Sequence, residues 1–241
     1  MTTAANNTAV AGFSAVGNWF IPDNIQRHPL GTIMSVIDPF WGGQEIVYCS
    51  FPASTALRVG TCVVYDNAFS ATAVPNTANL GQPLAFVLNS VPSVAAVQYG
   101  WVVFGGKIPA YSNASVAANA AIGIVAAGQL GANSAGKQVL DSKVQAAATT
   151  TVAKSNVVTQ NGSPKLLASN TDGWFVGMPI SGTGIPASTT VLSLDPDNRT
   201  VVMSANATAT GAVTVTGTYN DGTSFWNVLY VNRPLAQGAI T

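Results

Sequence analysis

Residues 84–104 read LAFVLNSVPSVAAVQYGWVVF and hold two short apolar runs, Leu84–Leu88 and Trp101–Phe104. Both runs are rich in Val and Phe, and turn-forming residues such as Asn, Ser, Pro and Gly lie between them. Apolar runs of this length, bounded by turn residues, are typical of buried β-strands. This stretch therefore predicts two β-strands.

The same pattern continues in both directions along the chain. Further strands are expected at residues 30–37, 45–50, 61–65, 190–194, 200–203, 212–216 and 225–231. Turn pairs in which Pro fixes φ, or Gly and Asn accept a positive φ, separate them: Asp38-Pro39, Gly42-Gly43, Asn161-Gly162, Asp195-Pro196 and Asp221-Gly222. Short, regularly spaced strands predict an all-β fold, either a small β-barrel or a jelly-roll-like sandwich.

Two Ala-rich stretches, residues 116–129 and 145–148, are the only ones with a helix-like composition. Gly123 and Gly128 interrupt the first stretch, and each glycine weakens a helix by about 1 kcal/mol relative to Ala. We therefore expect strands and turns in this region as well.

The chain divides into four segments. Residues 1–20 are small and polar, without the basic flank of a secretory signal, and are expected to form a flexible N-terminal arm. Residues 21–150 are expected to form the barrel or sandwich body, and residues 151–218 a second small β module that follows the Ala/Thr run 146–152. Residues 219–241 are expected to supply a C-terminal return strand and a tail.

The chain is 48% hydrophobic, but only 7% of its residues are charged, against about 25% in a typical domain. Its surface must therefore be covered largely by Thr, Ser, Asn, Gln and Ala. Such neutral groups cost much less to bury than ions. This composition suits large and permanent protein–protein contacts, and the alternative is a secreted protein with a Thr- and Asn-rich surface.

Several partners are not expected from these numbers. The net charge is zero, and Lys and Arg are scattered singly from Arg27 to Arg233, so we expect neither nucleic acid nor an anionic membrane to bind. No run of about 20 apolar residues is present that would cross a membrane. Cys49 and Cys62 are expected to be buried free thiols, because nothing around them resembles a four-ligand zinc site.

Residues suited to catalysis are scarce. The single histidine, His28, leaves little room for the commonest acid–base or triad chemistry. Most carboxylates stand before Pro or Gly, where turn formation explains them without a substrate. Residues 195–198 offer only three oxygen side chains and no closing Glu, so a hairpin turn is expected there and not a cation loop. We therefore predict no enzyme activity, no metal and no cofactor.

Two parts of the chain resemble structural proteins of bacteriophage particles. Residues 172–211, DGWFVGMPISGTGIPASTTVLSLDPDNRTVVMSANATATG, are similar to a module that recurs in virion proteins, in which two glycines permit a tight reversal before a β-hairpin. Residues 59–66 (VGTCVVYD), 80–86 (LGQPLAF) and 99–106 (YGWVVFGG), continued by residues 119–145, are similar to small phage capsid decoration domains. Together the two likenesses cover about half of the chain.

This resemblance implies a capsid decoration, or cement, protein on the capsid surface of a virion. Such a protein binds the major capsid protein as a homo-oligomer, here expected to be a homotrimer, and stabilises the shell. Trp19, Phe20, Trp41 and Trp226 are candidate interface anchors, and each is also a candidate for ordinary core packing. Two alternatives stay open: a head-fibre or tail-fibre adhesin that binds the host surface, and a virion enzyme that degrades polysaccharide.

Overall fold

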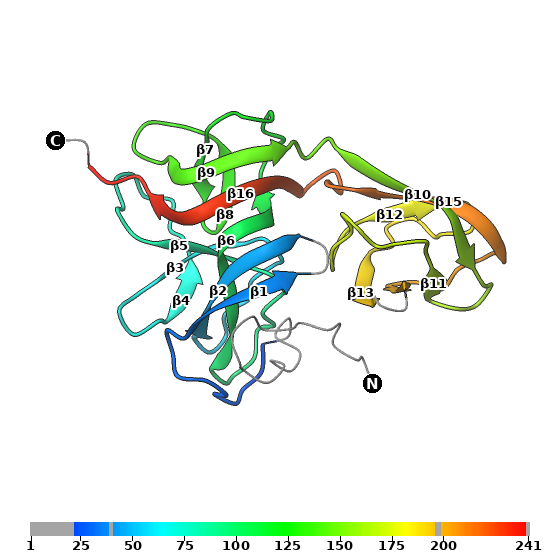
Figure 1. Ribbon diagram of the computed structural model, residues 1–241, viewed down its shortest axis with the longest axis horizontal. Helices are drawn as coiled ribbons and strands as arrows, with labels where there is room; N and C mark the ends of the chain where they lie inside the picture. The colour runs from blue at the N-terminus through cyan, green and yellow to red at the C-terminus, as the bar shows by residue number, and fades with distance from the viewer. Residues whose placement is uncertain (1–21, 39–40, 196–198, 240–241) are drawn as a thin grey trace.

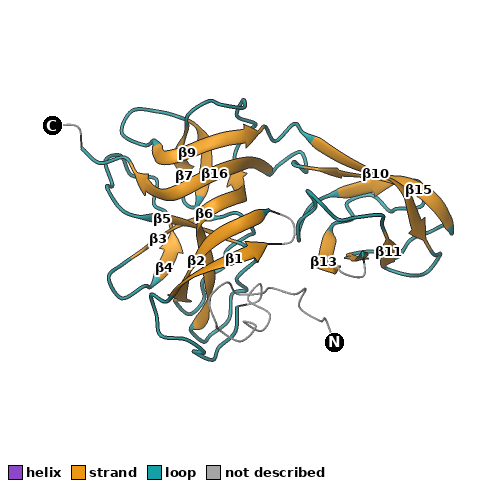
Figure 2. Ribbon diagram, in the orientation of Figure 1, coloured by secondary structure: helices purple, strands orange, loops and turns teal. Residues whose placement is uncertain are grey.

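The computed structural model describes residues 22–38, 41–195 and 199–239, and within them every regular element is a β-strand (Figures 1 and 2). The predicted all-β fold is confirmed. The strands form a ten-stranded and a six-stranded sheet. The first sheet holds β1 (Ile33–Asp38), β2 (Gly42–Phe51), β3 (Cys62–Tyr65), β4 (Ala71–Ala73), β5 (Leu84–Val87), β6 (Gln98–Ser112), β7 (Ile122–Ala126), β8 (Gln129–Ala132), β9 (Val139–Ala146) and β16 (Phe225–Ala236). The second holds β10 (Thr151–Thr159), β11 (Lys165–Leu167), β12 (Ile180–Gly182), β13 (Val191–Asp195), β14 (Thr200–Met203) and β15 (Gly211–Thr218).

The ten-stranded sheet is organised around the long strand β6. Its main path runs β1-β2-β6-β5-β3-β4, and β16 pairs with both β6 and β9. These pairings are antiparallel, whereas the β7–β8 hairpin meets β6 through a parallel pairing of Ser112 with Leu130. The first half of β6 therefore pairs with β2 and β5, and its second half pairs with β16 and β8.

A β-bulge in β6 keeps its apolar side chains on the core side. The pairing with β2 jumps from Ile46–Val103 to Glu45–Gly105, which leaves Phe104 as the extra residue. Because a bulge shifts the alternation by one residue, Val103 before it and Ile108 after it both enter the same core.

Both faces of the strands around β6 are covered by apolar side chains. Ile46, Phe86 and Val103 belong to the main core, whereas their neighbours in sequence, Val47 and Val102, belong to a second cluster on the opposite face. Side chains of consecutive strand residues point to opposite faces, so this division follows directly from the strand geometry. A strand buried on both faces is expected to read as a continuous apolar run, as WVVF does.

The six-stranded sheet is inserted between two strands of the first sheet. β9 and β16 pair antiparallel, and the chain that connects them forms the whole of β10 to β15, in the order β12-β15-β10-β11-β14-β13. Figure 1 shows this second sheet beside the first, with two connections between them. The contact contains one apolar cluster, to which the second sheet gives Trp174 and Phe175 and the first gives Val59, Trp226 and Val228.

Strand β16 serves both cores because its two faces are both apolar. Leu229 and Val231 point into the core of the first sheet, while Trp226 and Val228 point into the cluster that the two sheets share. The ring centroids of Phe175 and Trp226 are 5.6 Å apart, a usual separation for an aromatic pair. The shared cluster thus fixes the second sheet against the first by ordinary core packing.

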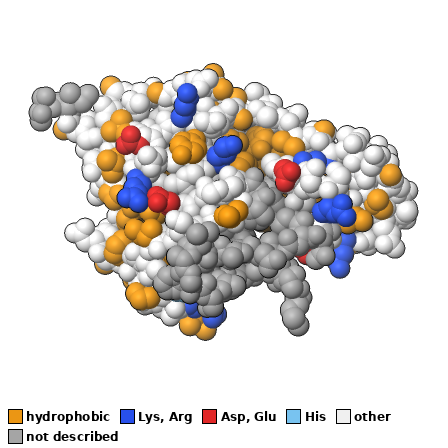
Figure 3. All heavy atoms as spheres, in the orientation of Figure 1, with side chains coloured by type: hydrophobic (Ala, Val, Ile, Leu, Met, Phe, Trp, Pro, Cys, Tyr) orange, Lys and Arg blue, Asp and Glu red, His pale blue; other side chains and the backbone are white. Residues whose placement is uncertain are grey.

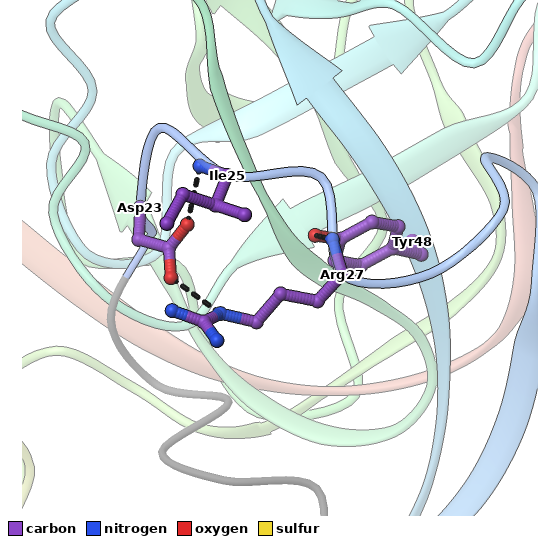
Figure 4. A network of polar contacts seen from close by, with 4 residues as sticks. All are labelled: Asp23, Ile25, Arg27 and Tyr48. Atoms are coloured by element: carbon purple, nitrogen blue, oxygen red, sulfur yellow. Dashed lines mark hydrogen bonds and ion pairs between the residues drawn. The ribbon is translucent and has the colours of Figure 1, made fainter.

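The first described residues of the chain are fastened to the ten-stranded sheet (Figure 4). The Asp23 carboxylate accepts hydrogen bonds from the Ile25 N–H and the Arg27 Nε, each at 2.6 Å. The Arg27 N–H in turn donates to the Tyr48 hydroxyl at 3.1 Å. The backbone of Asp23 also pairs with Tyr99, so this segment is held at both ends.

Most of the expected strands are present, and the hairpin expected around residues 195–198 is confirmed by the antiparallel pairing of β13 with β14. The Ala-rich stretch 116–129 forms β7 and the start of β8, with Gly128 in a turn at φ +69°, as predicted. One expectation was wrong. Gly42 and Gly43 open strand β2 and do not form the turn, because the reversal comes before them and Gly42 already pairs with Asp38. The expected N-terminal arm, residues 1–20, lies outside the described residues.

Candidate assembly surfaces

The described residues contain no group of three or more His, Cys, Asp or Glu side chains that could hold a metal ion. His28 packs against aromatic rings, with its centroid 5.2 Å from those of both Tyr48 and Trp101. Two carboxylates accept hydrogen bonds within turns. Asp66 accepts the N–H groups of Ala68 and Ser70 at 2.9 Å. Asp221 accepts the N–H groups of Thr223 and Ser224 in the turn before β16.

Across residues 22–38, 41–195 and 199–239, no helix is long and apolar enough to span a membrane.

The aromatic residues singled out as interface anchors fall in different places. Trp226 is only 5% exposed and packs in the cluster that the two sheets share. Trp41 is half-buried at the edge of the same cluster, 6.5 Å from the ring of Phe175. Both rings therefore contact other parts of this chain. Trp19 and Phe20 lie outside the described residues.

Strand β1 presents a small apolar surface at the edge of the ten-stranded sheet. Its side chains alternate strictly, with Met34 and Val36 buried and Ile33, Ser35 and Ile37 exposed. Ile33 and Ile37 are 56% and 53% exposed, and the charged residue on the same face, Glu45, stands opposite Ser35 on β2 and forms an ion pair with Arg233. β1 pairs with β2 on one side, and no described strand pairs with its other side. An unpaired edge with apolar side chains is a typical site for contact with another chain.

A second apolar surface lies on the outer face of the six-stranded sheet. Val158 on β10 stands directly opposite Leu167 on β11, and each side chain is 49% exposed. Ala212 on β15 extends the row on one side and Thr200 on β14 extends it on the other. Their side chains share one face because residues paired across a sheet point the same way.

The described residues carry few charges overall. Figure 3 shows hydrophobic side chains scattered over a mostly white surface with few red or blue groups. Two ion pairs occur among the described residues, Arg27 with Asp23 and Arg233 with Glu45. A surface of this kind has little charge to desolvate when another protein covers it.

A groove of about 690 Å³ crosses the outer face between β1, β2, β6 and β16. Three glycines, Gly43, Gly105 and Gly106, form part of its lining. The Glu45 carboxylate reaches over Gly105 to the Arg233 guanidinium, with Nε to Oε2 at 3.2 Å. A Cβ on Gly105 would lie only 3.0 Å from the Glu45 Cβ, so the glycine makes room for this pair.

The exposed residues of β1 and of the β10–β11 pair were not identified from the sequence. The run 30–37 predicts a strand but does not predict which face of that strand is covered. Which alternate residues stay exposed depends on β1 being the outermost strand of the sheet, and local sequence does not encode that position. No motif in the sequence marks Ile33, Ser35 and Ile37, or the cross-strand pair Val158 and Leu167, as exposed residues.

No family model matches this chain, and neither the curated proteins nor the solved structures include a match to it.

Proposed function

We propose that this protein is a capsid decoration protein that binds the outer surface of a phage shell as a homo-oligomer and stabilises it. The trimer implied by the sequence resemblance is the form we propose. The protein acts by covering surface and performs no chemistry.

One observation carries this proposal: exposed apolar side chains are gathered on two sheet surfaces that carry few charged residues. Ile33 and Ile37 stand on the open edge of the first sheet, and Val158 and Leu167 on the outer face of the second. In a protein with so few charged residues, these two surfaces are the ones that gain most by being covered.

In the proposed mechanism, the binding energy comes from apolar area that is buried at several contacts at the same time. Covering apolar area contributes about 25 cal/mol per Å², and the two surfaces belong to different sheets of one chain. An oligomer that uses both can contact neighbouring copies and the shell simultaneously, and linked contacts bind far more tightly than any one of them. The packed cluster between the sheets supports this, because a fixed arrangement of surfaces loses little entropy on binding.

The test is the ratio of this chain to the major capsid protein in purified particles, measured by quantitative mass spectrometry. A fixed ratio close to that of the shell subunits, with loss of shell stability when the chain is removed, is the expected result. A few copies per particle would replace this proposal with a fibre or tail component. Absence from particles would overturn the virion assignment.

A further inference from the structure

An exposed tyrosine with a lysine on each side lies on the outer face of the ten-stranded sheet. Tyr230 on β16 pairs with Lys107 on β6 and, on its other side, with Lys143 on β9. The three side chains therefore point the same way from three neighbouring strands, and the lysine backbones are roughly 10 Å apart. Tyr230 is 49% exposed and both lysines are exposed.

The two lysines are free to bind an anion. Neither ammonium group forms an ion pair within the described residues, whereas the nearby Arg233 is neutralised by Glu45. The chain has only five lysines, so two beside one exposed aromatic ring form an unusual concentration of positive charge on this protein. This pair of lysines is the feature that distinguishes the site from the two apolar assembly surfaces.

Tyr230 also lines the groove described above, whereas Lys107 and Lys143 do not. Ser35, Glu45 and Asn232 line the groove as well and present hydroxyl, carboxylate and amide groups. These groups can both donate hydrogen bonds to, and accept them from, a ligand rich in hydroxyls. The half-exposed ring of Tyr230 offers an apolar surface on which a sugar ring can lie, with its polar tip still in water.

The mixed charges decide between classes of ligand. Glu45 and Arg233 both line the groove and neutralise one another, so the groove itself adds no net positive charge to the two lysines. A densely charged chain such as a nucleic acid needs clustered Lys and Arg. A carbohydrate with an isolated carboxylate needs only the two lysines for its charge, and its hydroxyls can donate to Glu45. The arrangement therefore favours an acidic polysaccharide over the other anions.

We propose that the face around Tyr230 binds an acidic polysaccharide, with a sugar ring against Tyr230 and its carboxylate between Lys107 and Lys143. This function goes beyond shell binding, and its groove shares Ser35 and Ile37 with the β1 surface proposed for assembly. A decoration protein with this site would bring acidic surface glycans of a host cell to the particle.

The test is isothermal titration of the purified full chain with an oligogalacturonate as the acidic probe. An uncharged maltooligosaccharide and a polyglutamate peptide serve as the other two probes. We expect binding of the oligogalacturonate alone, weakening as sodium chloride is added, because the lysine contacts are screened.

Variants test whether the oligogalacturonate binds at Tyr230 and the two lysines beside it. Tyr230→Ala and the double variant Lys107→Gln/Lys143→Gln should each weaken oligogalacturonate binding about tenfold, which corresponds to about 1.4 kcal/mol. The matched control is Lys154→Gln/Lys165→Gln, which changes two lysines of the second sheet, the half-buried Lys154 that donates to Asn170 and the exposed Lys165, and it should bind like the unmodified chain. Thermal unfolding checks that every variant is folded.

Four results would overturn the proposal. These are no binding of the oligogalacturonate, equal binding of the uncharged sugar, preferential binding of polyglutamate, and binding that the Tyr230 and lysine variants leave unchanged. Preferential binding of polyglutamate would identify the site as a contact for an acidic protein segment.

Discussion

The indole N–H of Trp226 donates a hydrogen bond to the backbone carbonyl of Val59 at 3.1 Å, inside the apolar cluster that joins the two sheets. Trp226 stands near the start of β16, directly after the chain leaves the second sheet, and Val59 precedes β3 of the first. This bond gives a partner to the indole N–H and to the Val59 carbonyl, both of which are buried.

Replacing Trp226 by Ala should lower the free energy of unfolding by about 3–5 kcal/mol, because a large buried ring is removed from the shared cluster. Trp226→Phe should cost less, mainly through the unpaired carbonyl of Val59, about 1–3 kcal/mol. Urea denaturation measures both values. Leu192→Ala, at a side chain that is 55% exposed, is the control and should change stability little. A Trp226→Ala protein as stable as the control would contradict the packing described here.

Asn227 is fully buried and satisfies three backbone groups from two loops. Its Oδ1 accepts the N–H groups of Val116 at 2.9 Å and Ala148 at 3.0 Å, and its Nδ2 donates to the Ala114 carbonyl at 3.0 Å. Asn227→Leu keeps the volume similar but leaves all three groups without a partner. We expect it to destabilise the protein by at least about 3 kcal/mol in urea denaturation. A loss below about 1 kcal/mol would show that these loops find other partners.

Asp221 should give the stability a measurable dependence on acid pH. Partial burial would raise the pKa of Asp221, but hydrogen bonds from the backbone of Ser224 and from the backbone and hydroxyl of Thr223 outweigh it and lower the pKa. A lowered pKa means that the unfolded chain takes up the proton more readily than the folded one. The stabilisation is therefore complete above the ordinary pKa of about 3.9 and is lost as pH falls through the folded value.

The measurement is urea denaturation of the original chain and of Asp221→Asn, carried from neutral pH to strongly acidic pH. We expect the original chain to lose stability below about pH 4 and the variant to lose less over the same range. Asp172→Asn, which changes an exposed turn residue, is the matched control. Parallel curves for the original chain and Asp221→Asn would contradict this account.

Both cysteine thiols should be unreactive in the folded protein. Cys49 and Cys62 are buried and unpaired, as expected from the sequence, and they belong to clusters on opposite faces of the sheet. Burial, with a smaller effect of the Asp66 carboxylate, raises the pKa of Cys49 to about 12, and burial also raises the pKa of Cys62. Since the thiolate is the reactive form, Ellman's reagent should find both thiols only after denaturation. Rapid reaction at neutral pH without denaturant would contradict their burial.

The apolar surface on β1 should matter for assembly and not for folding. Ile33→Thr/Ile37→Thr keeps a β-branched side chain at both exposed positions and removes apolar area. We expect weaker self-association in sedimentation velocity, with the free energy of unfolding changed by no more than about 1 kcal/mol. The companion pair Val158→Thr/Leu167→Thr tests the other surface in the same way. Identical association of the β1 variant and the original chain would exclude β1 from the contacts between copies.

The sequence alone determined which parts of the chain become strands and where many of them reverse. Short apolar runs such as WVVF at 101–104 predict buried strands because they are too short for a typical helix, are rich in β-branched and aromatic residues, and are bounded by turn residues. Turn residues located the β13–β14 hairpin for a similarly local reason, since Gly, Asn and Asp accept backbone angles that others avoid. The low charge is likewise read from the sequence alone, because so few charged residues leave a largely neutral surface in any fold.

Only the tertiary structure decided which residues meet. Trp226 looked the same in sequence as an exposed anchor, and its burial follows from the insertion of β10–β15 between β9 and β16. The sequence separates Lys107 from Tyr230 by 123 positions. The two residues and Lys143 lie side by side because β16 pairs with β6 and β9 in registers that place both lysines opposite Tyr230. Strand register is set by long-range pairing and core packing, which no local pattern in this sequence encodes.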